Sequence, residues 1–522
     1  MTIKTGHTLG MWDHWKALLT VTFVSLSSFQ YGLDFGIIGG LQAMVGFLEV
    51  FGQKDPSVPL GWNLESEPQQ LIASLMILGA FISSSSAGFT AQYFGRKTSL
   101  WVACIGVFVS TVVMQIGALY AARLIIGLSN GLLMTHAQLY IQECAPGRYR
   151  GFGISIFTYW VSVGSLIGTV VDNFASKIHS KNAYVIPLGI VHVIPLILTI
   201  GLFFIPESPR WLAARGDMQK AERALLWLRP TGWSVADELE EMKTALTAEA
   251  QLQLSVGYLT LFSNPIDRRR TILSVLGLTT QAASGAMFII SFGTYFFEMA
   301  GVGNSFENSC ILTGAGVASL LFNALVITKY GRRRVMMISG FILCGLTQLA
   351  IAVVYTVEPG TRRSGQVLVG LSVAYIVSYN ALISTYAWLS GGELASQRLR
   401  SHTFGLATAV GFFGAWLTTF TAPYFINPYE LNWGPKYGYI WFGSCVIAAV
   451  WIWLYLPEAK DRRLEEIDEM FEAKVPARRF QKYQCVGVHA TIDKKPHVAY
   501  IENNNEGEAQ GTETKTLESR AK

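Results

Sequence analysis

One carboxylate lies in the middle of a long apolar stretch. Asp34 is the only charged residue between about residues 17 and 44. A charged side chain in the hydrocarbon core of a bilayer costs several kcal/mol, so it faces a partner or a water-filled cavity. Besides His136 and His192, Arg123 is the only basic residue in the apolar stretches that precede residue 206. We therefore predict that Asp34 pairs with Arg123.

The chemistry that suits this pair is reversible proton binding. Removal from water favours a neutral carboxyl group, whereas a neighbouring guanidinium favours the carboxylate. A small change in the distance between Asp34 and Arg123 therefore changes how readily the carboxyl group holds a proton. A fixed structural ion pair is the alternative. His136 lies in the same stretch as Arg123, and we interpret it as a core histidine that faces charged groups rather than as a second proton site.

The elements that must position these residues are membrane-spanning helices. Of the 522 residues, 51% are hydrophobic and 14% charged, whereas a soluble protein carries roughly a quarter charged residues. The windows 185–205, 335–355 and 439–456 contain no Lys, Arg, Asp or Glu, and about 20 apolar residues span a bilayer as a helix. We predict an all-α membrane protein with twelve transmembrane helices.

An internal repeat divides these helices into two pseudo-symmetric bundles of six. The pair Glu143 and Arg150 recurs as Glu393 and Arg400 at an offset of 250 residues. The motif FGRK at 94–97 recurs as YGRRR at 330–334, at an offset of 236 residues. Two homologous halves, with a site at their interface, are what a carrier that works by alternating access requires.

The basic residues predict the orientation of the bundles. The loops after helices 2, 4, 8 and 10 contain ten Lys and Arg, and the loops on the other side contain six. Loops rich in Lys and Arg face the cytoplasm, so both termini are expected there. The predicted parts are a cytoplasmic N-terminus (1–16), an N-terminal bundle (17–205), a cytoplasmic central loop with short helices (206–271), a C-terminal bundle (272–456) and a largely disordered cytoplasmic tail (457–522).

Four motifs occur in order along the chain and point to one family. They are ECAPGRYRG (143–151), PESPRWL (206–212), GTYFFEMAG (293–301) and GELASQRLRSHT (392–403). On these residues, the chain resembles the sugar porter family of the major facilitator superfamily, especially its fungal members, over about residues 15–470. The resemblance implies the major facilitator fold and the transport of a carbohydrate.

The resemblance also assigns roles to charged residues. It makes Asp34 the proton carrier and Arg123 its electrostatic regulator, as in related sugar–proton symporters, whereas related uniporters usually lack the aspartate. It makes a charged cluster at the cytoplasmic ends of the helices a gate, in which ion pairs between the halves break and form during transport. Charges that only orient the loops are the alternative. The gate residues are Arg96, Glu143, Arg150, Glu207, Arg332, Glu393 and Arg400.

Two departures from the family pattern concern this gate. Gln92 and Tyr93 stand where the loop motif of the family has Asp and Arg. In the second half, Thr328 stands where that Asp would be. Both halves have lost the same carboxylate, which is expected to change the balance between inward-facing and outward-facing states.

The resemblance places substrate contacts at five positions. Sugars are held by amide side chains and by aromatic faces. The family has amides at the positions of Thr158, Ala282 and Met287, and a Trp at the position of Phe412, so the case for an ordinary hexose is weaker. The predicted substrate-binding residues are Tyr31, Thr158, Gln281, Met287 and Trp388.

Three functions remain open on the sequence. The first is proton-coupled symport of a carbohydrate, and the second is a major facilitator carrier or exporter of another organic metabolite. The third is a non-transporting sugar sensor. An enzyme is disfavoured because no catalytic triad, metal cluster or phosphate-binding loop occurs. We expect a monomer in the plasma membrane whose partners are a solute, a proton and the bilayer, with no cofactor, no metal and no nucleic acid.

Overall fold

Long α-helices form most of the structure. The computed structural model describes residues 11–485, except 57–60, 116–117, 147–148, 179, 232, 252–257, 300–302, 328–330, 360, 397, 428–429, 461 and 463. Within these residues, ten helices are long and apolar enough to cross a membrane, and two bent helix pairs bring the possible number to twelve. This agrees with the twelve predicted spans. The features described below belong to the compact unit Met1–Tyr483.

The first set of spans covers residues 15–202. It consists of α1 (Trp15–Leu41) with α2 (Val45–Phe51), α3 (Ser66–Ser85) with α4 (Ala87–Tyr93), α5 (Arg96–Gln115), α6 (Leu119–Cys144), α7 (Arg150–Ala175), and α8 (Asn182–Ile190) with α9 (Val193–Leu202). A 3-10 turn, η1 (Met11–His14), precedes α1. The short strands β1 (Gln53–Lys54) and β2 (Trp62–Asn63) pair in antiparallel orientation after α2.

A linker and the second set of spans follow. The linker contains α10 (Pro209–Ala214), α11 (Met218–Leu228), α12 (Val235–Gln251) and α13 (Thr260–Ser263). The second set, residues 265–455, consists of α14 (Pro265–Ala283) with α15 (Ala286–Met299), α16 (Ser305–Phe322) with the π-helix η3 (Asn323–Ile327), α18 (Arg333–Val357), α19 (Arg362–Tyr379) with the π-helix η4 (Asn380–Ser384) and α20 (Thr385–Leu394), α21 (Arg400–Ile426), and η5 (Gly434–Tyr437) with α22 (Gly438–Tyr455). Helices α23 (Leu464–Glu472) and η6 (Ala477–Arg479) complete the unit.

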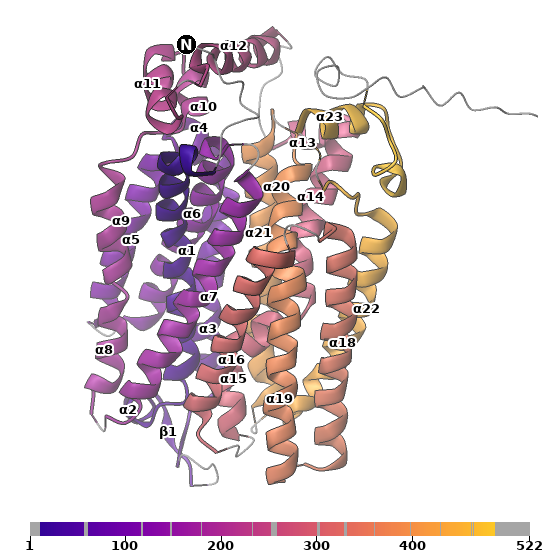
Figure 1. Cartoon of the computed structure of the whole chain (residues 1–522). Helices are drawn as coiled ribbons and strands as arrows, with labels where there is room; N and C mark the ends of the chain where they lie inside the picture. The colour runs from indigo at the N-terminus through magenta and orange to yellow at the C-terminus, as the bar shows by residue number, and fades with distance from the viewer. Residues whose placement is uncertain are drawn as a thin grey trace, which may run out of the picture. The chain divides into compact units, whose positions relative to one another are not determined.

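The spans lie side by side, and the connecting elements gather at their two ends. Figure 1 shows α10 to α13 and α23 at one end, and β1 at the other. We call these the linker end and the β1 end. Helices of the two sets pack on each other between them, namely α3 on α21, α7 on α16, and α1 on α15. Any site between the sets is therefore enclosed by helices of both.

The second span is bent where serines follow one another. The helix axis bends by 51° between α3 and α4. The hydroxyl groups of Ser85 and Ser86 donate hydrogen bonds to the backbone carbonyls one turn earlier, those of Phe81 and Ser83. Bonds of this kind compete with the regular helical pattern and bend helices. The run of four serines at 83–86 therefore explains the break.

A tyrosine of the linker fills this break. The hydroxyl group of Tyr258 donates to the carbonyl oxygen of Ser85 and accepts from the backbone N–H of Gly88. Its ring also packs edge-on against His402 of α21, with 5.1 Å between the ring centroids. One linker side chain thus satisfies backbone groups at the bend and contacts the second set at the same time.

Glycines allow α1 and α7 to touch along their backbones. A Cβ atom at Gly32 would lie 1.9 Å from the carbonyl oxygen of Val161, and one at Gly164 would lie 2.2 Å from that of Phe29. Small residues commonly permit such close approach of membrane helices. The position of Asp34 on α1 is therefore fixed relative to α7.

Candidate functional site

Asp34 and Arg123 form a buried ion pair between α1 and α6. Nη1 of Arg123 lies 2.9 Å from both carboxylate oxygens of Asp34. Nε of Arg123 donates to the carbonyl oxygen of Ile72 in α3 at 3.0 Å. Each of the two charged side chains is only 1% exposed. The structure thus brings together the two residues that the sequence paired and adds a third helix that holds the guanidinium.

The surroundings make this contact sensitive to a proton on Asp34. Little water screens the two charges at this depth, so their attraction is strong. Either charge alone would be costly to bury. Protonation of Asp34 would remove the attraction between the charges, while Arg123 would keep its bond to Ile72. The pair can therefore act as a connection between α1 and α6 that a proton loosens.

A cavity of about 140 Å³ lies between the two sets of spans. One water molecule needs about 10–15 Å³ of such volume, so the cavity has room for a small solute. Tyr31 and Phe35 line it, and both are neighbours of Asp34 on α1. Asp34 and Arg123 are not among its lining residues. The ion pair is therefore separated from the cavity by the wall that α1 provides.

The predicted substrate contacts come from five different helices, α1, α7, α14, α15 and α20. All five lie on the wall of the cavity: Tyr31, Thr158, Gln281, Met287 and Trp388. Phe412 lines the same wall, and its ring centroid is 5.8 Å from that of Tyr31. An aromatic surface therefore extends from the first set to the second.

Sequence reasoning missed a second amide on this wall, Asn380. It is the first residue of η4, and π-helical turns are frequent at functional sites. Its Nδ2 lies 3.5 Å from Oγ of Ser162 in α7. On the same side, the hydroxyl group of Tyr379 donates to Oε1 of Gln281 at 3.2 Å. An amide within the mostly apolar stretch 367–391 is the signal that could have identified Asn380.

Hydroxyl groups supply the remaining polarity of the cavity. Thr158 lies 3.2 Å from Thr385, and Thr169 lies 2.9 Å from Thr313, measured between hydroxyl oxygens. Each contact joins α7 to a helix of the second set. None of the described lining residues is an Asp, Glu, Lys, Arg or His. This wall suits an uncharged solute that exchanges hydrogen bonds with amides and hydroxyls.

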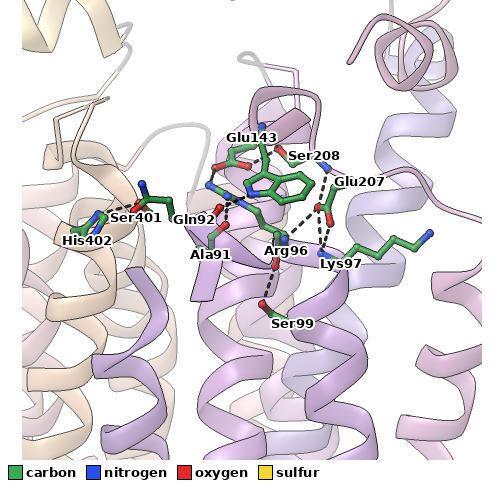
Figure 2. Close-up of polar contacts among 12 residues, drawn as sticks. Ala91, Gln92, Arg96, Lys97, Ser99, Glu143, Glu207, Ser208, Ser401 and His402 are labelled. Atoms are coloured by element: carbon green, nitrogen blue, oxygen red, sulfur yellow. Dashed lines mark hydrogen bonds and ion pairs between the residues drawn. The ribbon is translucent and has the colours of Figure 1, made fainter. Parts of the chain in front are cut away.

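A charged cluster lies at the linker end of the first set (Figure 2). Nη2 of Arg96 contacts Oε1 of Glu143 at 2.6 Å, and Nη1 donates to the carbonyl oxygen of Ala91 at 2.7 Å. The hydroxyl group of Ser208 donates to the other oxygen of Glu143 at 2.5 Å. The start of α5, the end of α6 and the start of α10 are therefore tied together through one carboxylate.

Glu207 caps the first turn of α5. Its carboxylate accepts from the backbone N–H groups of Arg96, Lys97 and Ser208 at 2.9–3.2 Å. Free N–H groups and the positive end of the helix dipole both favour a carboxylate at this place. Burial nevertheless raises the pKa of Glu207, although these hydrogen bonds and Arg96 oppose the shift.

The second set repeats both contacts. Nε and Nη2 of Arg333 each donate to an oxygen of Glu393 at 2.8 Å. Glu458 accepts from the backbone N–H groups of Arg333 and Arg334 at 3.1 and 3.0 Å, which caps the start of α18. This is the arrangement that Arg96, Glu143 and Glu207 form in the first set. The repeat in the sequence therefore corresponds to a repeat in side-chain geometry.

One gate residue was predicted one position too early in the sequence. Arg332 was expected in this cluster, but its side chain is exposed, and Arg333 makes the contact with Glu393. The two motifs match at an offset of 237 residues rather than 236, because Arg96 and Arg333 are the first residues of α5 and α18. The start of the helix, and not the glycine before it, decides which way the arginine points.

The described ion pairs of this cluster lie within the two sets, and ion pairs between the halves stay a prediction. Arg96 with Glu143 and Arg333 with Glu393 each connect helices of one set. Arg400 is buried at the start of α21, while the side chain of Arg150 lies outside the described part of the structure.

Four further residues were singled out in the sequence, and three of them are described by the structure. The backbone carbonyl of Gln92 accepts from Nε1 of Trp211 at 2.9 Å, and Tyr93 is exposed. Thr328 lies outside the described residues. His136 is buried, with Nδ1 3.0 Å from the carbonyl oxygen of Leu132 and Nε2 3.0 Å from the hydroxyl group of Thr90. These contacts agree with its interpretation as a core histidine.

Comparison with known proteins identifies relatives along nearly the whole chain. Residues 20–471 match the family described as "Sugar (and other) transporter". The major facilitator-type transporter ecdD of Aspergillus rugulosus is 30% identical over 507 residues, which covers 93% of this chain and 92% of that protein. The probable glucose transporter rco-3 of Neurospora crassa is 29% identical over 478 residues, 87% and 79% of the two chains.

A solved structure shares the fold. The proton:xylose symporter XylE, bound to 6-bromo-6-deoxy-D-glucose, superimposes with a TM-score of 0.72 and 19% identity. The match covers 88% of this chain and all of that one. The helices described above are therefore arranged as in a major facilitator protein.

Proposed function

The chain belongs to the family of sugar (and other) transporters, which are membrane carriers and not enzymes, and we propose that it carries a carbohydrate together with a proton by alternating access. One observation carries this proposal. The buried ion pair of Asp34 and Arg123 lies behind the wall of an uncharged cavity rich in aromatic, amide and hydroxyl groups. A proton site and a solute site are thus separate but share α1.

This shared helix gives a physical route for coupling. When Asp34 takes up a proton, its attraction to Arg123 falls, and α1 is released from α6. Tyr31 and Phe35 on the same helix contact the cavity, so a solute there favours some positions of α1 over others. Two ligands that bias one element in the same direction are coupled in free energy. Net transport of one then drives the other.

The wall of the cavity supports a neutral polyol as the solute. Gln281 and Asn380 supply two amides, and Tyr31, Trp388 and Phe412 supply flat apolar surfaces. Amides both donate and accept hydrogen bonds, as sugar hydroxyl groups do. The five predicted contacts at Tyr31, Thr158, Gln281, Met287 and Trp388 are part of the proposed solute site, to which Asn380 is added.

A second candidate is a carrier or exporter of another organic metabolite. It is favoured by Thr158, Ala282 and Met287, which stand at positions where the family has amides and which all line the cavity. Such a solute would be uncharged and less rich in hydroxyl groups than a hexose.

The remaining parts of the proposal concern orientation and gating. We propose that the linker end faces the cytoplasm, together with both termini, in the plasma membrane, and that the protein acts as a monomer. The central loop and the tail then lie on the cytoplasmic side of two six-helix bundles. The clusters around Glu143 and Glu393 brace the cytoplasmic ends of the helices within each bundle, and they move as units when the gate opens.

The test is solute uptake by the purified protein in proteoliposomes. Radiolabelled monosaccharides and disaccharides are offered with an inward proton gradient, and again without a gradient. We expect accumulation above equilibrium with the gradient and equilibration without it. Equilibration under both conditions would contradict proton coupling. If none of the sugars is taken up, a carbohydrate is not the solute. The second candidate then remains, and uptake of a panel of other neutral metabolites tests it.

A further inference from the structure

A second carboxyl group is buried in the first set, and the mechanism above does not use it. Asp172 lies near the β1 end of α7 and is 1% exposed. No side chain among the described residues bonds to its carboxyl oxygens, and the group within hydrogen-bonding reach is the backbone of Gly40. An unpaired carboxylate would be far more costly to bury than a neutral carboxyl group. Asp172 therefore differs from Asp34, whose carboxylate is paired with the guanidinium of Arg123.

Asp172 continues the row of glycines by which α7 packs on α1. Gly164, Gly168 and Asp172 are spaced by four residues, and so are Gly32, Gly36 and Gly40 on α1. Residues four apart lie on one face of a helix. A Cβ atom at Gly40 would lie only 2.0 Å from Oδ2 of Asp172. The carboxyl group thus occupies the space that the missing side chain of Gly40 leaves free.

This place is also where α7 meets the second set. Thr169, one turn before Asp172, contacts Thr313 of α16 through the hydroxyl–hydroxyl hydrogen bond of 2.9 Å. Sγ of Cys310 in α16 donates to the backbone carbonyl of Thr169 at 3.5 Å. Thr169 and Thr313 line the cavity, so Asp172 lies one helical turn beyond it. The contact between α7 and α16 that closes the cavity on this side therefore lies one turn from the place where Asp172 is buried against α1.

The titratable and charged groups around Asp172 are few in the described structure. On α16, Cys310 and Glu307 are close enough to interact electrostatically with one another, and Cys310 also with Asp172. On α1 the facing residue is Gly40. After α7, Lys177 lies over the ring of Phe174 and is exposed. None of these contacts supplies Asp172 with a counter-charge.

We propose that Asp172 is a second proton-binding group, which must be neutral for α7 and α16 to close at the β1 end of the cavity. This inference rests on the alternating access of the proposed function. When the two helices separate, water reaches the carboxyl group and it ionises. When they close, water is excluded from the carboxyl group beside Gly40, and the group takes up a proton. Acidic conditions therefore favour closure at this end.

The test measures the distance between α7 and α16 and needs no solute. Spin labels are attached through K177C and I311C, two exposed positions on either side of the contact, in a background with C310S and C485S. Pulsed electron resonance on the full chain in nanodiscs gives the populations of short and long distances between pH 5 and 8. A transition linked to one proton changes their ratio by up to about tenfold per pH unit.

We expect the short distance to gain population as the pH falls. In D172N, the neutral amide has the shape of the acid, so the short distance should dominate at every pH. In D267N, which changes a carboxylate paired with Arg398 at the linker end, the pH dependence should remain. A ratio that does not change with pH in the wild type would overturn the proposal, and so would a D172N variant that keeps the wild-type dependence.

A second variant covers the case in which D172N does not fold. G40A places a methyl group where the carboxyl group lies, so the long distance should dominate at every pH. G370A is the matched control, because a Cβ atom there meets no atom within 4 Å. A G40A variant that behaves like G370A would overturn the proposal. Loss of proton coupling in uptake, with these distances unchanged, would refute the proposed energy source but not this gate.

Discussion

The two sets of spans differ in the kind of polar group that they bury. The first set buries two carboxyl groups, Asp34 and Asp172, and the guanidinium of Arg123 within its membrane-spanning helices. The second set contributes the neutral amides of Gln281 and Asn380 to the cavity. The comparison suggests a division of labour in which one half binds protons and the other supplies most of the polar contacts to the solute.

At the linker end, in contrast, the two sets are alike. Glu207 and Glu458 cap α5 and α18, and Glu143 and Glu393 each bind the arginine that begins the capped helix. Symmetry is thus retained where the structure braces helix ends and lost where ligands bind. A duplicated scaffold can keep its mechanical contacts while its two interiors acquire different chemistry.

The largest expected effect is the loss of uphill transport in D34N. Asparagine cannot take up and release a proton, so accumulation under a proton gradient should fall to the equilibrium level, while solute exchange across the membrane persists. The measurement is uptake and counterflow in proteoliposomes. D267N is the matched control in the second set, because Asp267 pairs with Arg398 at the linker end at 3.0 Å. A D34N variant that still concentrates its solute would refute the assignment.

Removal of either amide of the second set is expected to have a smaller effect on transport. Q281A and N380A each remove a donor and an acceptor from the cavity wall, which costs about 1–3 kcal/mol of binding where a partner is left unsatisfied. We expect KM to rise by roughly tenfold, with accumulation at saturating solute unchanged. S162A, which removes the partner of Asn380 in the first set, should have a weaker effect. A variant that lost coupling but kept its KM would contradict the division of labour.

The smallest effect tests the symmetry of the linker end. E207Q and E458Q each weaken one helix cap, and the loss of a capping side chain costs about 0.5–2 kcal/mol. Because the two caps belong to different sets, their costs should be similar and additive. Thermal unfolding in detergent of both single variants and of the double variant provides the measurement. A cost confined to one of the two variants would show that the ends are not equivalent.

The fold followed from the sequence because apolar length and repeated motifs are direct consequences of a membrane and a duplication. The pair of Asp34 and Arg123 was also predictable, since few charges occur within the apolar stretches. Arg332 could not be distinguished from Arg333 because three arginines follow one another, and only the first residue of α18 decides which side chain meets Glu393.

Two other features were hidden for a different reason. Asn380 stands out in the sequence only as an amide in a mostly apolar stretch, and the π-helical turn that turns it toward Ser162 leaves no sequence signal of its own. The role of Asp172 depends on Gly40, which is 132 residues away in the sequence. Only the packing of α1 on α7 connects the two.

The position of Tyr258 at the bend of the second span affects how α3 and α21 can move apart. Its hydroxyl group joins the backbone on both sides of the bend, and its ring lies against His402 on α21. Any motion that parts α3 from α21 at the linker end must pull this ring from one partner or the other. The linker thus does more than join the two sets along the chain, because Tyr258 also connects the bend of the second span to α21.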